Sequence, residues 1–179
     1  MTHRAVYRFA PKKAFEAIHY MVSSSQPIDL HTILKACYFA DKSHLNEHHK
    51  PIFGATYRAM RFGPVPLEIY EMVKGESLWL WECGRDRMPW SLHGYRVSLD
   101  ENENSDLGEF SETEKEHLIN GLRQSASMSF TDRTAATHGP DWQKANGGII
   151  AYEDMLDENM PGRDQIVEYM RETARHVRL

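Results

Sequence analysis

Apolar residues recur at helical spacing along much of the chain, which predicts a mostly helical protein. The first such stripe spans residues 12–23, and Pro27 lies shortly after it. Proline lacks an amide hydrogen and disfavours helix in the residue before it, so the first helix ends there. Asp29 is a good N-cap for a second helix that runs to about His49. At roughly 30 Å, this helix is long enough to be the spine of the domain.

The middle of the chain changes character after this long helix. Pro51 and Gly54 are expected to stop it, and residues 52–62 are ambiguous between a strand and an irregular connector. Apolar spacing over residues 67–74 predicts a short helix that ends at Gly75. Between residues 78 and 99, the runs LWLWEC and GYRVSL alternate aromatic or branched residues with others. This pattern predicts an antiparallel pair of strands joined by a polar loop.

The last third again favours helices. Residues 100–109 are acidic and form an expected exposed linker. Ser111 with Glu114 matches a capping box at a helix start, and Thr131 opens a short helix that ends near His138. The fold class predicted is α+β, a mostly helical single domain with a small antiparallel sheet or hairpin. Its core spans residues of about 14–158, and a closing amphipathic helix spans about 163–177.

Composition narrows the class of protein. With 179 residues, 41% hydrophobic and 26% charged, the chain is expected to be one globular domain. A formal charge of -5 argues against a dedicated nucleic-acid partner, because phosphate contacts need clustered Lys and Arg. No apolar run approaches the roughly 20 residues that span a bilayer, and the N-terminus lacks a signal-peptide pattern. Two cysteines form no disulfide framework, so a cytoplasmic protein is expected.

One short motif is typical of zinc enzymes. HLNEH, residues 44–48, has the H-x-x-E-H order, and helical spacing puts His44 and His48 on one face. A zinc enzyme needs a third ligand and an open position, and the sequence indicates no further cluster. His44 and His48 are therefore weak metal candidates, and a zinc-dependent hydrolase that also uses Glu47 is kept as an alternative. With no nucleophile elbow or phosphate loop, we predict no catalytic residues and no cofactor.

The connector after the long helix has the composition of an interface. Aromatic residues, methionine and arginine are enriched where proteins meet. The alternative is that its aromatic residues close the core, with the arginines more exposed. A basic N-terminal arm (Arg4, Arg8, Lys12, Lys13) and a basic C-terminal helix (Arg163, Arg171, Arg175, Arg178) leave open a DNA-binding regulator of its own operon. A solvated charged face is the preferred explanation, because the total charge is negative. The candidate partner-binding residues are Tyr57, Arg58, Arg61, Phe62 and Pro64.

Four segments resemble the Panacea domain, the SocA-like antitoxin family that includes phage-associated GepA-like proteins. They are KACYFADKSHL (35–45), YRAMRFGPVPLEIYEMVK (57–74), FSETEKEHLINGL (110–122) and MSFTDRTAATHGPDWQKA (128–145). The resemblance covers about residues 14–158. The chain departs from the pattern at Ala36 and Cys37, where leucines are common, and near His49, where glycine is common.

This resemblance implies a non-enzymatic antitoxin that neutralises a neighbouring toxin by direct binding, and it brings no catalytic residues with it. In the SocA branch, the antitoxin is instead a proteolytic adaptor that delivers its bound toxin to the ClpXP protease. The expected partners are thus a cognate toxin and, for an adaptor, ClpX. The family does not reveal which toxin, because the domain occurs beside many unrelated ones.

Overall fold

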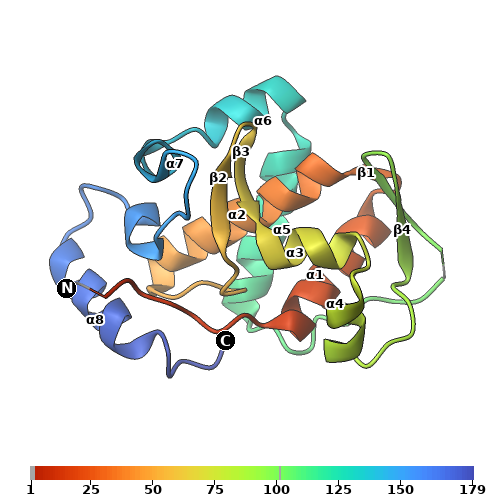
Figure 1. Cartoon of the computed structure of the whole chain (residues 1–179), viewed down its shortest axis with the longest axis horizontal. Coiled ribbons are helices and arrows are strands. Elements are labelled where there is room, and N and C mark those ends of the chain that lie inside the picture. The colour runs from red at the N-terminus through yellow and green to blue at the C-terminus, as the bar shows by residue number, and fades with distance from the viewer. Residues whose placement is uncertain (1–2, 101) are drawn as a thin grey trace.

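A long central helix, α2 (Leu30–His48), crosses the middle of the computed structural model, which describes residues 3–100 and 102–179 (Figure 1). It begins where predicted, because the Asp29 carboxylate accepts hydrogen bonds from the amides of His31 and Thr32. Its last residue is His48, and the following residue, His49, caps the helix with a φ of 59°, in the left-handed region. Glycine favours that region, and glycine is common near this position in the family that the sequence resembles. In this chain, His49 takes the left-handed conformation instead.

The helix α5 (Glu112–Ala126) packs most extensively against α2. The predicted capping box is confirmed, with the Ser111 hydroxyl accepting from the Glu114 amide and the Glu114 carboxylate accepting from the Ser111 amide. Gly121 lies at the crossing point, where a Cβ atom would approach the Ala36 carbonyl oxygen to 2.7 Å. The two helix backbones are therefore too close for a side chain at this position.

The other helices surround this pair (Figure 1). Among the described residues they are α1 (Pro11–Ser24), α3 (Leu67–Val73), α4 (Ser77–Glu82), α6 (Phe130–Ala136), α7 (Pro140–Ala145), the 3-10 helix η1 (Tyr152–Met155) and α8 (Arg163–Thr173). The chain before α1 runs alongside α8, and the Ala5 amide donates to the Glu153 carboxylate at 2.9 Å.

The strands form two small antiparallel sheets. One has the order β1-β5-β4, and the other is the hairpin of β2 and β3, in which Tyr57 pairs with Pro66 and Met60 with Gly63. Arg61 and Phe62 form the turn of that hairpin. The strands are β1 (Ile28–Asp29), β2 (Tyr57–Met60), β3 (Gly63–Pro66), β4 (Trp90–His93) and β5 (Arg96–Leu99). The predicted α+β class, mostly helical with a small antiparallel sheet, is confirmed.

One predicted strand is wrong. The run LWLWEC was assigned to a strand, but residues 77–82 form α4, and the hairpin expected there lies further along, in β4 and β5. Helical winding buries Trp79, which packs edge-on against Phe9 at 5.0 Å and donates its indole N–H to Glu71. Trp81 is left 76% exposed on the same helix. Trp79 and Trp81 are two positions apart, which resembles the alternation of a strand. In a strand both would point to the same face, whereas in the helix only Trp79 is buried.

The cap of α6 also differs from the sequence expectation. The Ser129 hydroxyl, not that of Thr131, accepts from the Asp132 amide, and the helix ends at Ala136. Residues 52–62, left ambiguous, contain strand β2 from Tyr57 to Met60. No helix in the described part of the chain is both long and apolar enough to cross a membrane.

We predict that Gly121→Ala destabilises the protein, although alanine normally favours a helix over glycine by up to about 1 kcal/mol. The new methyl group would press on the Ala36 carbonyl and the Ala40 amide of α2, and overpacking of this kind costs about 1–3 kcal/mol. Urea unfolding measures the change. The control is Glu116→Ala, an exposed position of the same helix, which should leave stability within about 0.5 kcal/mol. A more stable Gly121→Ala variant would contradict the close crossing.

Candidate partner-binding surface

A buried carboxylate of α2 fixes the chain that leads into the β2–β3 hairpin. Asp41 is completely buried, and one of its oxygens accepts from the amides of Ile52 (2.6 Å) and Phe53 (3.0 Å). Its other oxygen accepts from the Tyr57 hydroxyl at 2.8 Å. Burial raises the pKa of Asp41 to about 6, while these three hydrogen bonds act to lower it. The aspartate that interrupts the apolar stripe of the sequence therefore anchors the start of the hairpin.

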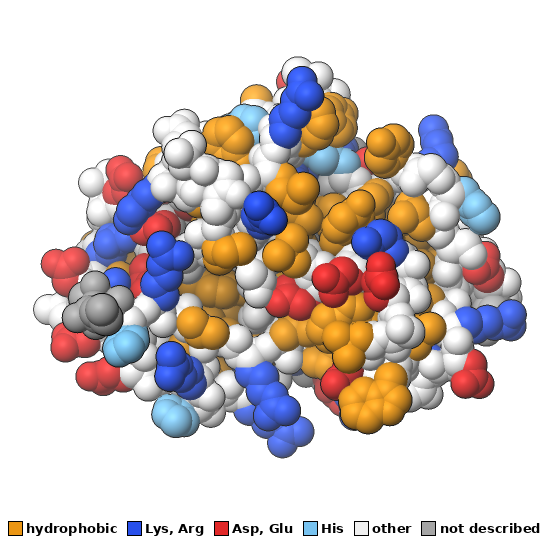
Figure 2. Space-filling model, in the orientation of Figure 1, with side chains coloured by type: hydrophobic (Ala, Val, Ile, Leu, Met, Phe, Trp, Pro, Cys, Tyr) orange, Lys and Arg blue, Asp and Glu red, His pale blue; other side chains and the backbone are white. Residues whose placement is uncertain are grey.

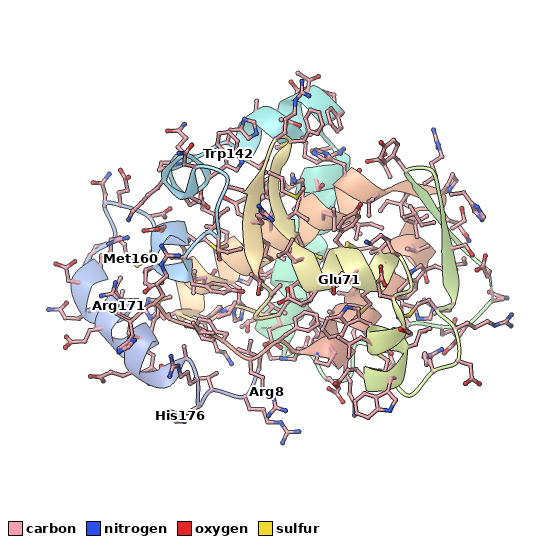
Figure 3. All side chains as sticks on the ribbon, viewed as in Figure 1. Arg8, Glu71, Trp142, Met160, Arg171 and His176 are labelled. Atoms are coloured by element: carbon pink, nitrogen blue, oxygen red, sulfur yellow. The ribbon has the colours of Figure 1, made fainter. Side chains whose placement is uncertain are left out.

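Three backbone carbonyls near the hairpin tip are each bound by a side chain from another element. The bonds run from the Trp142 indole to Met60 (2.8 Å), between the His31 ring and Phe62 (3.1 Å), and from the Lys35 ammonium to Pro64 (2.7 Å). Figure 3 labels Trp142, which lies on α7 next to the hairpin. Because these three bonds hold the main chain of the hairpin, the exposed side chains at its tip are presented on a fixed backbone.

His31 links the hairpin to α6 through both ring nitrogens. Its Nδ1 accepts from Arg133 at 2.9 Å, which leaves the proton on Nε2 to be donated to the Phe62 carbonyl. Burial lowers the pKa of His31 to about 4, and the positive charges of Lys35 and Arg133 lower it further. The ring is therefore neutral at pH 7, in the one tautomer that serves both bonds.

Lys35 is a buried cation that contacts the hairpin turn. Burial, with a smaller contribution from Arg133, lowers the pKa of its ammonium to about 7. Gly63 has a φ of 100°, and a Cβ atom there would overlap the Thr137 hydroxyl and approach Lys35 Cε to 2.9 Å. The glycine in the FGPV motif is thus required both by backbone conformation and by the closeness of α2 and α6.

The helix α7 is tied to α2 by a second polar group. The Tyr38 hydroxyl donates to Asp141 at 2.6 Å, and the Lys42 ammonium lies 3.3 Å from the same carboxylate. On the outer side of α7, the His138 ring stacks on Trp142 with centroids 3.7 Å apart. These contacts hold Trp142 in place for its bond to the hairpin, so its indole N–H has a structural partner.

The outward side chains form an apolar surface that also carries arginine. We call it the tip surface, and it comprises Arg58, Met60, Arg61, Phe62, Phe130 and Ile149. The apolar members are all exposed: Met60 44%, Phe62 46%, Phe130 48% and Ile149 43%. Figure 2 shows hydrophobic side chains gathered over the hairpin and α6, with Lys and Arg among them.

Ring contacts join the two halves of the tip surface. Phe62 of the turn packs edge-on against Phe130 of α6 at 5.2 Å, and the Arg61 guanidinium lies over the Phe62 ring at 5.2 Å. Arg58 donates to the Gly147 carbonyl at 3.3 Å, next to Ile149. Aromatic packing and the arginine contact restrict the rotamers of the exposed rings, which lowers the entropy cost of binding.

The five predicted partner-binding residues fall into two groups. Arg58, Arg61 and Phe62 are exposed on the tip surface, whereas Tyr57 and Pro64 are buried beneath it. Sequence reasoning missed Phe130, because nothing in residues 128–145 shows that α6 folds beside the hairpin. Its only local signal is an aromatic residue at a helix start, between the cap Ser129 and a polar run.

The two other predicted sets of residues have the following environments. His44 and His48 share one face of α2 as expected, with ring centroids 4.6 Å apart, and His44 Nδ1 lies 2.7 Å from the Lys50 carbonyl. In the basic set, Lys13 forms a buried ion pair with Glu114 at 2.9 Å. Figure 3 labels Arg171, whose guanidinium lies 3.0 Å from the buried carboxylate of Glu153. These two charges are paired within the protein, whereas Arg4, Arg8 and Lys12 of the N-terminal arm are exposed.

One of the comparisons with known proteins identifies a family. The family model for the antitoxin SocA-like Panacea domain matches residues 33–143, which include most of α2, the hairpin, α5, α6 and the start of α7. The chain therefore belongs to the SocA-like Panacea antitoxin family. No curated protein and no solved structure matches the chain.

We predict that Lys35→Met flattens the rise of stability with pH above neutrality. The ammonium has a pKa of about 7 when folded and titrates near about 10.4 in an unfolded chain, so between these values the unfolded state binds more protons. Stability then rises with pH, by at most about 1.4 kcal/mol per pH unit. Urea unfolding from pH 7 to 10 tests this, with the exposed Lys12→Met as the control. Parallel profiles for Lys35→Met and wild type would refute the buried charge.

Proposed function

We propose that the protein is an antitoxin that neutralises a cognate toxin by direct contact through the tip surface, and that it performs no chemistry of its own. Family membership supports the antitoxin role. The feature that supports the site is the hairpin turn, where Met60, Arg61 and Phe62 project from a backbone held by Trp142 and His31. We propose that the protein acts in the cytoplasm, where it would encounter a toxin made by the same cell.

The energetics of the tip surface favour a protein partner. Removing apolar surface from water lowers the free energy by about 25 cal/mol per Å². Four half-exposed apolar side chains therefore provide a driving force for association with another protein. Aromatic residues and arginine are the types most often found as binding hot spots. Since the backbone is already fixed by internal bonds, little conformational entropy remains to be lost on binding.

Charge at the tip surface gives the expected chemistry of the partner. The chain as a whole has a formal charge of -5, yet the exposed charged groups of the tip surface are Arg58 and Arg61. A toxin surface with an apolar pocket rimmed by Asp or Glu would match both features. Complementary charges raise the association rate and exclude wrong partners, while the rings supply most of the affinity.

We expect the double variant Arg58→Ala/Arg61→Ala to weaken toxin binding about tenfold or more, and Phe62→Ala to weaken it by about 30-fold or more. The test is a pull-down followed by calorimetry with the toxin encoded beside this chain. Truncation of side chains that project into solvent should leave the fold unchanged, which circular dichroism checks.

Trp81→Ala provides the matched control, because Trp81 is an aromatic residue that is 76% exposed and lies on α4, outside the tip surface. Binding of this control should equal that of the wild type. Equal toxin affinity for the wild type, the double arginine variant and Phe62→Ala would remove the tip surface from the interface. Loss of affinity in Trp81→Ala alone would move the interface to α4.

We further propose delivery of the bound toxin to ClpXP as the way in which neutralisation is completed, on the basis of family membership. In a reconstituted assay, toxin should be degraded by ClpXP when this protein is present and should persist without it. Phe62→Ala should slow degradation in proportion to its loss of toxin affinity. A toxin that is inhibited but not degraded would show that neutralisation is steric, and the tip surface would then be sufficient by itself.

A further inference from the structure

A cluster of metal-ligating side chains lies at the C-terminal end of α2. One ligand atom each from Glu47, His48 and His117 lies within 4.8 Å of the others. Glu47 and His48 are neighbours on α2, whereas His117 comes from α5. The HLNEH motif therefore has a third partner nearly 70 residues along the chain, which its local pattern did not reveal.

The Glu47 carboxylate lies between two imidazole rings. Glu47 Oε2 is 3.1 Å from His117 Nε2, and Glu47 Oε1 is 3.6 Å from His48 Nε2. The His48 Nε2 atom is buried, and no hydrogen-bond partner for it is found in the described part of the chain. A buried ring nitrogen without a partner is costly, and a bound cation would satisfy it.

Neighbouring groups orient the His117 ring for this role. Its Nδ1 lies 2.7 Å from the Ser43 hydroxyl, which donates its own proton to the Ala40 carbonyl at 3.2 Å. When a cation is bound, the hydroxyl can accept the Nδ1 proton, which leaves the Nε2 lone pair for the metal in place of the Nε2 contact with Glu47. Metal-binding histidines commonly donate their second nitrogen to such a group.

His44 closes the inner side of the cluster without joining the group of close ligand atoms. Its ring centroid is 4.6 Å from that of His48 and 5.2 Å from that of His117. The metal candidates predicted from the sequence were His44 and His48. The geometry retains His48 and favours Glu47 and His117 in place of His44.

We propose that Glu47, His48 and His117 bind one divalent transition-metal cation, with Zn²⁺ as the best match, and thereby join the C-terminal end of α2 to α5. Tetrahedral zinc with bonds of about 2.0–2.1 Å places ligand atoms about 3.3 Å apart. The two carboxylate oxygens of Glu47 lie 3.1 Å and 3.6 Å from the two ring nitrogens, and one ligand atom from each of the three residues lies within 4.8 Å of the others, so a small contraction brings the three ligand atoms to zinc distances. Two imidazoles with one carboxylate suit Zn²⁺, and not Mg²⁺ or Ca²⁺, which prefer oxygen ligands.

The role of Glu47 separates this site from that of a zinc hydrolase. In the H-x-x-E-H enzymes considered from the sequence, the glutamate acts on a water molecule and the metal is held by other groups. Here the Glu47 carboxylate faces both rings and is itself a ligand. Its side chain is 65% exposed, so the fourth position opens to solvent. Three protein ligands with an open fourth position are also found in catalytic zinc sites, so the structural role proposed here rests on the joining of α2 to α5. That role is independent of the toxin-binding function.

Metal analysis of tag-free protein tests the proposal directly. After removal of metal with a chelator and dialysis against Zn²⁺, we expect about one zinc ion per chain. At a free Zn²⁺ concentration about 100-fold above Kd, Tm should rise by about 5–10 °C, because the ion binds only the folded chain. Mg²⁺ at the same concentration should leave Tm unchanged.

The variants Glu47→Gln and His117→Gln should each lose stoichiometric zinc and the shift in Tm, with affinity reduced at least about tenfold. Glu47 is exposed, so its substitution keeps the fold intact even if His117→Gln does not. The control is His93→Ala, an exposed histidine at the end of β4, which should bind zinc like the wild type. Wild-type protein without stoichiometric zinc, or Glu47→Gln protein that binds zinc equally well, would overturn the site.

Discussion

The hydrogen bonds that α2 makes with the following chain are the constraint on which the rest of the structure depends. The Asp41 carboxylate accepts hydrogen bonds from the amides of Ile52 and Phe53 and from the Tyr57 hydroxyl. The chain between α2 and β2 has little regular structure of its own. A carboxylate at a fully buried position is unfavourable unless such donors surround it. The connector therefore has one arrangement that satisfies Asp41, and that arrangement sets where the hairpin starts.

The same helix then fixes the other end of the hairpin, but through main-chain acceptors. The Phe62 and Pro64 carbonyls are bound by His31 and Lys35, two side chains one turn apart on α2. Bonds to carbonyls are insensitive to which side chain the bound residue carries. The side chains of the turn are thus free to vary without loosening the hairpin, which suits a surface proposed to bind a protein partner.

Sequence pattern predicted the parts of the fold that depend on local interactions. The Asp29 cap and the Ser111 capping box satisfy amides within their own helix starts, so their signals are complete within a few residues. The α4 helix was missed because the burial of Trp79 is decided by Phe9, far away in sequence. The same reason explains Phe130 and His117, whose partners lie on other elements. Local patterns identified the candidate turn and the HLNEH motif, but tertiary contacts complete both.

The tip surface and the Glu47, His48 and His117 cluster lie near opposite ends of α2. The residues that bind the hairpin tip, His31 and Lys35, lie near the start of α2, whereas Glu47 and His48 lie at its end. At 1.5 Å per residue, about 20 Å of helix separates them. Because α5 packs along α2 and Gly121 brings the backbones together between these ends, the proposed cation at the far end would act on a contact that is already tight. Its stabilisation should therefore appear in unfolding of the helix pair, while the conformation of the tip surface remains set by α2, α6 and α7.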